Sequence, residues 1–175
     1  MGMPADSVEV AIQDRTAYVK VHGRGTFKIA SNLKQFGMAA AAQGCSRIVA
    51  EMTDCLGMDS TFMGVLAGLA VHLRKKDGEL VLRNLSDKNS FLIRMLGLSH
   101  LVRMEQGGGG QDMPADARVL EAGTDKQTLT KTMIDSHETL GQVAPENIVK
   151  FKDVLAFLKE DLQRSGEQNG VERLP

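Results

Sequence analysis

The chain contains no tryptophan, a single tyrosine and only two cysteines among its 175 residues. With so few aromatic rings it lacks the stacking platforms by which proteins bind single-stranded nucleic acid. Its formal net charge is -1 at pH 7, which excludes a general attraction to nucleic acid or to an anionic membrane surface. The composition therefore favours a partner other than nucleic acid.

The sequence also lacks the patterns of a disulfide framework and of a membrane span. Cys45 and Cys55 are too few for a disulfide framework, and we expect Cys45 to be a small buried apolar residue. No apolar run reaches the length of a membrane span, and residues 1–10 lack the apolar core of a signal peptide. These absences predict a cytoplasmic protein without a membrane span.

The residue patterns of common enzymes are not found either. None of the four histidines has a cysteine or a second histidine at metal-ligand spacing, and we expect His137 to be a core or interface residue. The glycines at 107–110 lack the Gly-Lys-Ser/Thr that completes a phosphate-binding loop, so they predict a linker. The sequence therefore predicts a protein that is not an enzyme and that has no metal or cofactor.

The first part of the chain has the pattern of an α/β domain. Two alternating runs, over residues 8–12 and 17–22, flank Asp14 and Arg15 and predict a β-hairpin. Helices are predicted over residues 31–43 (with Ser31 as N-cap), 60–76 and 86–96, followed by strands over residues 47–52, 79–85 and 101–105. This order favours a mixed sheet of four to five strands with crossover helices.

The remainder is predicted to be an extension of that domain. The domain would occupy residues 1–106, a Gly-rich linker residues 107–123, an α-helical hairpin residues 124–164 and a disordered tail residues 165–175. Thr124 and Gln127 have the spacing of a capping box at the first helix of the hairpin. We expect the hairpin to pack on the domain or on a second copy of the chain, which would form a homodimer.

The cluster Asp59-Ser60-Thr61 stands where the second predicted helix begins. An N-cap explains Asp59, because its carboxylate would accept from free backbone N–H groups of the first turn. The two hydroxyls also lie where the positive end of the helix dipole favours an added phosphate. Ser60 and Thr61 are therefore both candidates for phosphorylation.

Three stretches resemble the STAS domain of anti-sigma factor antagonists. They are VKVHGRGTFKIASNLKQF, RIVAEMTDCLGMDSTFMGVLAGL and SFLIRMLGLSHLVRM, and together they extend over residues 8–106. The resemblance implies a STAS-like fold and a switch that works by protein binding. An anti-sigma factor serine/threonine kinase would phosphorylate the hydroxyl two residues after the motif aspartate, and a phosphatase would remove the phosphate.

Carried over by position, the resemblance makes Asp59 the motif aspartate and Thr61 the phosphoacceptor, with Ser60 as its neighbour. The partner-binding residues that it implies are Thr26, Asp59, Phe62, Met63 and Gly64. Two of these depart from the family pattern, since Phe62 replaces a glycine and Thr26 stands where an aspartate is frequent.

Two other functions fit the same sequence. The chain could be a STAS adaptor or assembly module that is not phosphorylated and that docks through its C-terminal helices. It could also bind a small ligand in the crevice between sheet and helices, or act there as an enzyme. Binding that survives loss of Thr61 would favour the adaptor, and heat stabilisation by a metabolite would favour the ligand-binding domain.

Overall fold

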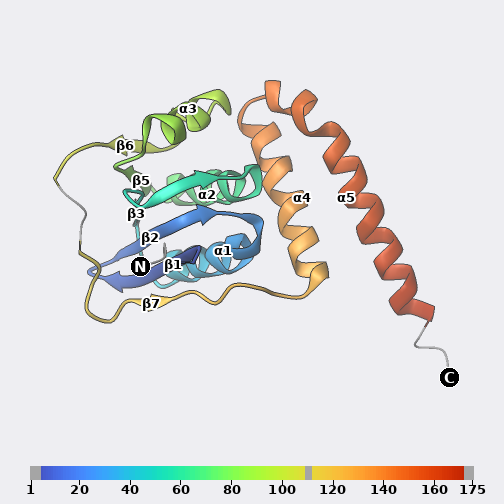
Figure 1. Ribbon diagram of the computed structural model, residues 1–175, viewed down its shortest axis with the longest axis horizontal. Helices are drawn as coiled ribbons and strands as arrows, with labels where there is room; N and C mark the ends of the chain where they lie inside the picture. Colours follow the sequence, from blue (N-terminus) through green and yellow to red (C-terminus); the bar gives the residue numbers. More distant parts are fainter. Residues whose placement is uncertain (1–4, 109–111, 172–175) are drawn as a thin grey trace.

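The computed structural model describes residues 5–108 and 112–171, and its strands and helices alternate through the first hundred residues (Figure 1). In chain order, the elements are β1 (Ser7–Gln13), β2 (Thr16–Gly25), α1 (Phe27–Ala42), β3 (Arg47–Glu51), β4 (Cys55–Met58), α2 (Ser60–Arg74), β5 (Glu79–Arg83), α3 (Asp87–Met95), β6 (Arg103–Glu105), β7 (Arg118–Val119), α4 (Lys126–Val143) and α5 (Glu146–Val171). The predicted α/β order is confirmed, with β4 and β7 as additional short strands.

The sheet is mixed, as predicted. Within residues 5–108 and 112–171 it has seven strands in the order β6-β5-β3-β2-β1-β7, with β4 paired to β2 outside this row. β2, β3, β5 and β6 are parallel, and β1 and β2 form an antiparallel hairpin. Its turn residues Asp14 and Arg15 have φ angles of 52° and 61°, as a type I′ turn requires. The sheet exceeds the predicted four to five strands because β4 and β7 join it.

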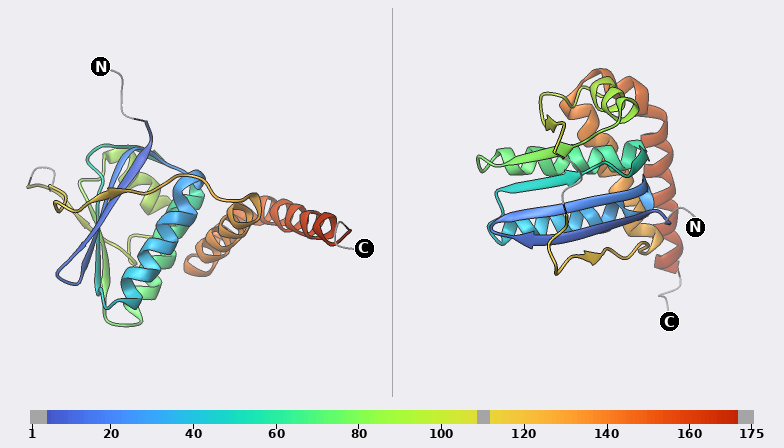
Figure 2. Two further views of the ribbon diagram at one scale, coloured as in Figure 1. Left: turned by 90° about the horizontal axis from the view of Figure 1, so that it is seen from below. Right: turned by 60° about the vertical axis from the view of Figure 1, so that its left-hand side comes forward.

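The molecule is built in layers (Figure 2). Helices α1 and α2 cover one face of the sheet, and α4 and α5 form a further layer on the outside of α1 and α2. Alternation along β2 explains why α1 and α2 pack on one face of the sheet, since Val19 and Val21 are buried there while Tyr18 and Lys20 lie on the opposite face. The core therefore lies between the sheet and the α1–α2 pair, as the alternation predicts.

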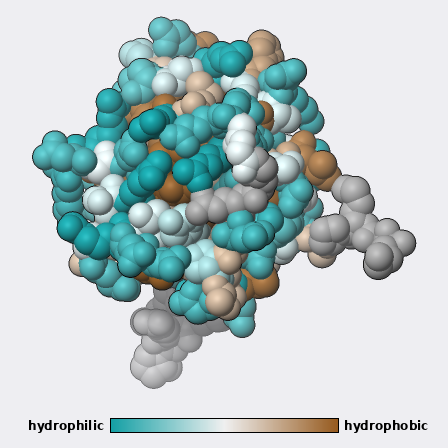
Figure 3. Space-filling view, turned by 90° about the vertical axis from the view of Figure 1, so that its left-hand side faces the viewer, coloured by the Kyte–Doolittle hydropathy of each residue, from teal (hydrophilic) through white to brown (hydrophobic). Residues whose placement is uncertain are grey.

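The opposite face of the sheet is mainly hydrophilic (Figure 3). Charged side chains pair across its strands: His22 Nε2 lies 2.6 Å from Glu9 Oε2, and Arg83 Nε lies 3.1 Å from Glu105 Oε2. The hydrogen bond from Arg83, with the charges of neighbouring arginines, lowers the pKa of Glu105 below its usual value. Cross-strand pairs of this kind keep polar groups on this face partnered.

Two helix starts differ from the prediction. Helix α1 begins one turn earlier than expected, because Thr26 and not Ser31 is its N-cap and Oγ1 of Thr26 accepts from Lys28 N. Helix α4 is capped by Asp125 and not by Thr124, since the Asp125 carboxylate accepts from Thr128 N at 2.8 Å. Aspartate is a strong N-cap, and its carboxylate replaces the capping box that the sequence indicated.

The C-terminal region is more ordered than predicted. Helix α5 extends to Val171, so residues 165–171 are helical and only residues 172–175 of the expected disordered tail lie outside the described residues. The expected linker contains β7, which pairs with β1, while its residues 109–111 also lie outside the described part. None of the helices in the described ranges combines the length and apolar character required to cross a bilayer.

Candidate functional site at the start of helix α2

Asp59 joins two helices through one carboxylate. It follows strand β4, and its backbone N–H donates to Gly25 O at 3.0 Å. Oδ1 accepts from Phe62 N at 2.8 Å and so caps α2, while Oδ2 accepts from Phe27 N, at the first residue of α1, at 2.7 Å. The predicted N-cap is confirmed, and the same side chain also fixes the start of α1 relative to α2.

Thr26 lies next to this carboxylate, as the prediction of a shared partner-binding surface requires. Both residues line a small cavity of about 240 Å³, together with Arg24, Gly57 and Lys88. A Cβ placed on Gly57 would lie 3.9 Å from Lys88 Nζ and 4.0 Å from Arg24 Nε, so the two cations flank this glycine. Two cations and the Asp59 carboxylate therefore meet at this cavity, close to two helix N-termini.

Sequence reasoning missed Arg24 and Lys88 as members of the site. Arg24 stands between two glycines at the end of β2, and its position two residues before Thr26 places it near the start of α1. Lys88 comes from the first turn of α3, more than twenty residues away in sequence, and nothing in its local pattern indicates its location. Parallel strands place the starts of α1, α2 and α3 at the same edge of the sheet.

Helix α4 covers Ser60, the first of the two candidate hydroxyls, and Thr61 is buried. Ser60 is half-buried, and its Oγ lies 2.8 Å from Nε2 of His137 on α4. Nδ1 of His137 lies 2.6 Å from the Met133 carbonyl oxygen, which can only accept, so Nδ1 carries the proton. In the neutral ring Nε2 is then an acceptor for the Ser60 hydroxyl. Thr61 has only 3% of its surface exposed.

The other expected partner-binding residues are buried as well. Phe62 is fully buried, and a Cβ on Gly25 would lie 2.8 Å from its ring. Met63 is 4% exposed. Gly64 lies directly under α4, where a Cβ would lie 2.6 Å from both Cβ and O of Ser136. Of the five residues, Thr26 and Asp59 remain partly accessible, and Phe62, Met63 and Gly64 do not.

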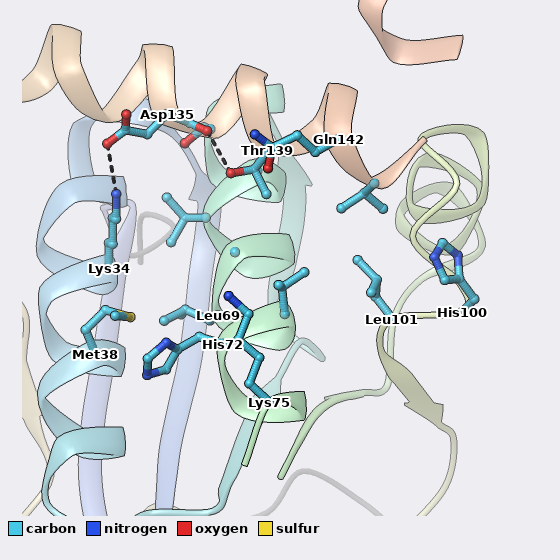
Figure 4. A pocket seen from close by; sticks show the side chains of 16 residues that line it. Lys34, Met38, Leu69, His72, Lys75, His100, Leu101, Asp135, Thr139 and Gln142 are labelled. Atoms are coloured by element: carbon cyan, nitrogen blue, oxygen red, sulfur yellow. Dashed lines mark hydrogen bonds and ion pairs between the residues drawn. The ribbon is translucent and has the colours of Figure 1, made fainter. Parts of the chain in front are cut away.

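Helix α4 contacts α1 through polar groups on the other side of this site. Ser31 Oγ lies 2.9 Å from Thr132 Oγ1 in a buried hydrogen bond, and Lys34 Nζ lies 3.1 Å from Asp135 Oδ2. A cavity of about 520 Å³ remains between α4 and the α1–α2 pair, with Lys34 and Asp135 at one end and Lys75 extending into it (Figure 4). The predicted packing of the hairpin on the domain is therefore confirmed, through a contact that is not fully filled.

The site has few groups suited to catalysis. Within the described ranges, no cluster of three or more histidine, cysteine or acidic side chains could hold a metal ion. Both cysteines are buried, as predicted for Cys45, and burial raises the pKa of each thiol. His137 is 3% exposed and packs edge to face on Phe151, which confirms it as an interface histidine. These groups are suited to packing and binding.

Comparison with known proteins matches the domain part of the chain. The anti-sigma-B factor antagonist of Staphylococcus aureus (strain NCTC 8325) is 27% identical over 101 residues, which cover 58% of this chain and 94% of that protein. The anti-sigma factor antagonist SpoIIAA in its unphosphorylated form has a TM-score of 0.53 and 19% identity, with 58% of this chain and 89% of that chain covered.

A second solved structure has the same fold. The Bacillus cell fate determinant SpoIIAA in the phosphorylated form has a TM-score of 0.51 and 18% identity, with 58% of this chain and 92% of that chain covered. A family model described as "Mlab, STAS domain" matches residues 8–103, which is more than half of the chain. The chain therefore belongs to the STAS domain family, and it carries α4 and α5 beyond the matched domain.

Proposed function

We propose that the chain is a regulator of the anti-sigma factor antagonist type, which binds a partner at the start of α2 and is switched by phosphorylation there. The observation that carries this proposal is the position of Ser60 and Thr61 in the first turn of a helix capped by Asp59, within a STAS fold. The partner would be an anti-sigma factor serine/threonine kinase, and a phosphatase would reverse the modification. Thr61 is the proposed acceptor and Ser60 the alternative.

The electrostatics of the site support a phosphate at this place. The first turn of α2 presents the positive end of the helix dipole, and Arg24 and Lys88 flank the neighbouring Gly57. A phosphorylated side chain carries nearly two negative charges and several strong acceptor oxygens, so the positive end of the helix dipole would stabilise it. The same added charge would repel an acidic partner surface that docks beside Asp59.

The test is intact mass spectrometry of the full chain after incubation with ATP and an anti-sigma factor kinase from the source cells. Thr61→Ala and Ser60→Ala are each other's matched control, because they remove neighbouring hydroxyls from one helix turn. We expect one added phosphate that is lost in Thr61→Ala and kept in Ser60→Ala. The reverse pattern would move the acceptor to Ser60, and no phosphate with a kinase that modifies another family member would refute the switch.

A second candidate function is a STAS adaptor that docks through its C-terminal helices, as a homodimer or on another protein. It is favoured by the exposed apolar side chains of α5, where Val149 is 71% and Phe157 66% exposed. Side chains of this size are uncommon on an open helix surface unless a partner covers them. Phe157→Ser would abolish association of an adaptor, whereas it would leave a complex formed at the start of α2 intact.

A further inference from the structure

We propose that α4 is an internal gate on the start of α2: while it is docked, neither Ser60 nor Thr61 can be modified, and a modified chain cannot dock it again. This inference deepens the proposed function, on which it rests, by assigning a regulatory role to the C-terminal extension. The steps that lead to it are the closure of the site, the character of the α4 contact and the way in which the hairpin is attached.

The docked helix leaves no room for a phosphate. The Ser60 hydroxyl is 2.8 Å from His137 Nε2, so a phosphorus atom with three oxygens cannot be placed between them. Thr61 is 3% exposed, and a kinase must reach its hydroxyl with the γ-phosphate of ATP in line. Access to Ser60 therefore requires α4 to move away from α2, and the proposed gate includes Thr61, which lies in the same first turn of α2.

The contact between α4 and the domain is polar at the start of α2 and apolar near the end of α4. Toward α1 and the first turns of α2, the helix presents Thr132, Asp135 and Ser136, which are small or polar side chains, whereas Leu140 belongs to the domain core. Interfaces inside one chain that are polar resemble transient protein interfaces, and relative motion across them is expected. The cavity of about 520 Å³ beside this contact shows that the contact is also incompletely packed.

The two helices of the hairpin also hold each other. His137 packs on Phe151 with ring centroids 4.8 Å apart, and a Cβ on Gly141 would lie 3.2 Å from Ile148. The turn of the hairpin is tied to the end of α3, because Asn147 Nδ2 donates to Leu96 O at 2.9 Å. The hairpin should therefore move as one unit about this turn, which would free the start of α2 without unravelling α4.

The segment before α4 can permit such a movement. About twenty residues separate β6 from α4, and within them Gly107, Gly108 and Gly123 have positive φ angles that favour glycine. Asn32 Nδ2 donates to Gly123 O at 3.3 Å, and β7 pairs with β1, so this segment keeps the hairpin close to the domain. Release is then a displacement over a short range, after which the helix can dock again.

The gate is tested by the reactivity of a cysteine in place of the proposed acceptor. Thr61→Cys in the full chain is treated with a maleimide, and the parent protein, whose two cysteines are buried, supplies the background rate. The rate reports the fraction of molecules in which α4 is displaced. Ser136→Arg is then added, because a larger side chain cannot fit against Gly64. Gln127→Arg, at an exposed position in the first turn of α4, is the matched control.

We expect Thr61→Cys alone and with Gln127→Arg to react at close to the background rate. Ser136→Arg should raise the rate by about tenfold or more, because it shifts the equilibrium toward the displaced state. Equal rates in all three proteins, at unchanged circular dichroism, would overturn the gate. Fast labelling of Thr61→Cys without any release variant would overturn it as well, since α4 would then not shield the site.

A disulfide supplies the opposite perturbation and replaces the first arm if Ser136→Arg prevents folding. A Cβ on Gly68 would lie 4.0 Å from Thr139 Cγ2, so Gly68→Cys with Thr139→Cys can link α2 to α4. With kinase and ATP, the oxidised protein should take up no phosphate and the reduced protein should take it up. Equal phosphate uptake in the oxidised and reduced proteins would refute the gate. If neither protein takes up phosphate while maleimide labelling does respond to Ser136→Arg, only the proposed phosphorylation is refuted.

Discussion

Replacing Asp59 by alanine should destabilise the whole domain, because one carboxylate caps α2 and holds the start of α1. The change removes two charge-assisted hydrogen bonds, at 2.8 Å to Phe62 N and at 2.7 Å to Phe27 N. Loss of a helix N-cap costs about 1 kcal/mol, and a hydrogen bond to a charged group is worth about 1.5–3 kcal/mol. Phe27 is exposed, so water can replace part of the second bond.

These terms give an expected loss of about 2–3 kcal/mol in the free energy of unfolding for Asp59→Ala. In a chain of this size the loss lowers the melting temperature by roughly 5–10 °C. Asp59→Asn keeps one acceptor oxygen and turns an N–H toward the other helix, so we expect a smaller loss, of about 1 kcal/mol. Urea titrations followed by circular dichroism measure both, with a lower midpoint and an unchanged slope.

Asp87→Ala is the matched control, since Asp87 is an exposed carboxylate in the first turn of α3 whose N-cap is Ser86. It should cost less than about 1 kcal/mol, through the helix dipole alone. If Asp59→Ala and Asp87→Ala shift the urea midpoint equally, the shared capping role is refuted. The same conclusion would follow if Asp59→Asn were as stable as the unmodified protein.

Three further perturbations test other parts of the structure by the same titration. Phe62→Ala empties a fully buried position and should cost about 3–5 kcal/mol; a loss below about 1 kcal/mol would contradict its place in the core. Glu105 has a lowered pKa, so its contribution to stability is present above its unfolded pKa and is lost as the pH falls through the folded value. Glu105→Gln should therefore reduce the fall in the free energy of unfolding at acid pH. An unchanged fall would refute the role of the pair that Glu105 forms with Arg83. Asn147→Ala removes two buried hydrogen bonds of 2.9 Å, one to Leu140 O in α4 and one to Leu96 O at the end of α3, and should cost about 1–3 kcal/mol. A neutral effect would show that these bonds do not fix the turn between α4 and α5.

Local chemistry made the order of elements and the cap of α2 predictable. Asp59 precedes an apolar helical run, and its N-cap role depends on neighbours within three residues. The start of α1 was misplaced because Ser31 and Thr26 are both suitable caps. The tertiary structure places Ser31 against Thr132 on α4, more than a hundred residues away. Local sequence contains no signal for such a partner.

The accessibility of the site could not be predicted for the same reason. Gly64 was expected to bind a partner protein, but the element that lies against it is α4, through Ser136. Small side chains on two helices fit each other by shape, which leaves no periodic pattern in either sequence. β4 was missed because its four residues include a glycine and do not alternate clearly.

Helix α4 and the face that it covers belong to one polypeptide, and this affects any protein that binds the same face. A tethered segment acts as a ligand at an effective concentration that is about millimolar for short flexible connections, and dilution does not lower it. The apparent affinity of an external partner is reduced by the fraction of molecules in which the face is covered. The length of the connection before α4 would therefore set the partner concentration that is needed for binding. Shortening or lengthening the connection would change this concentration without any change in the contact residues.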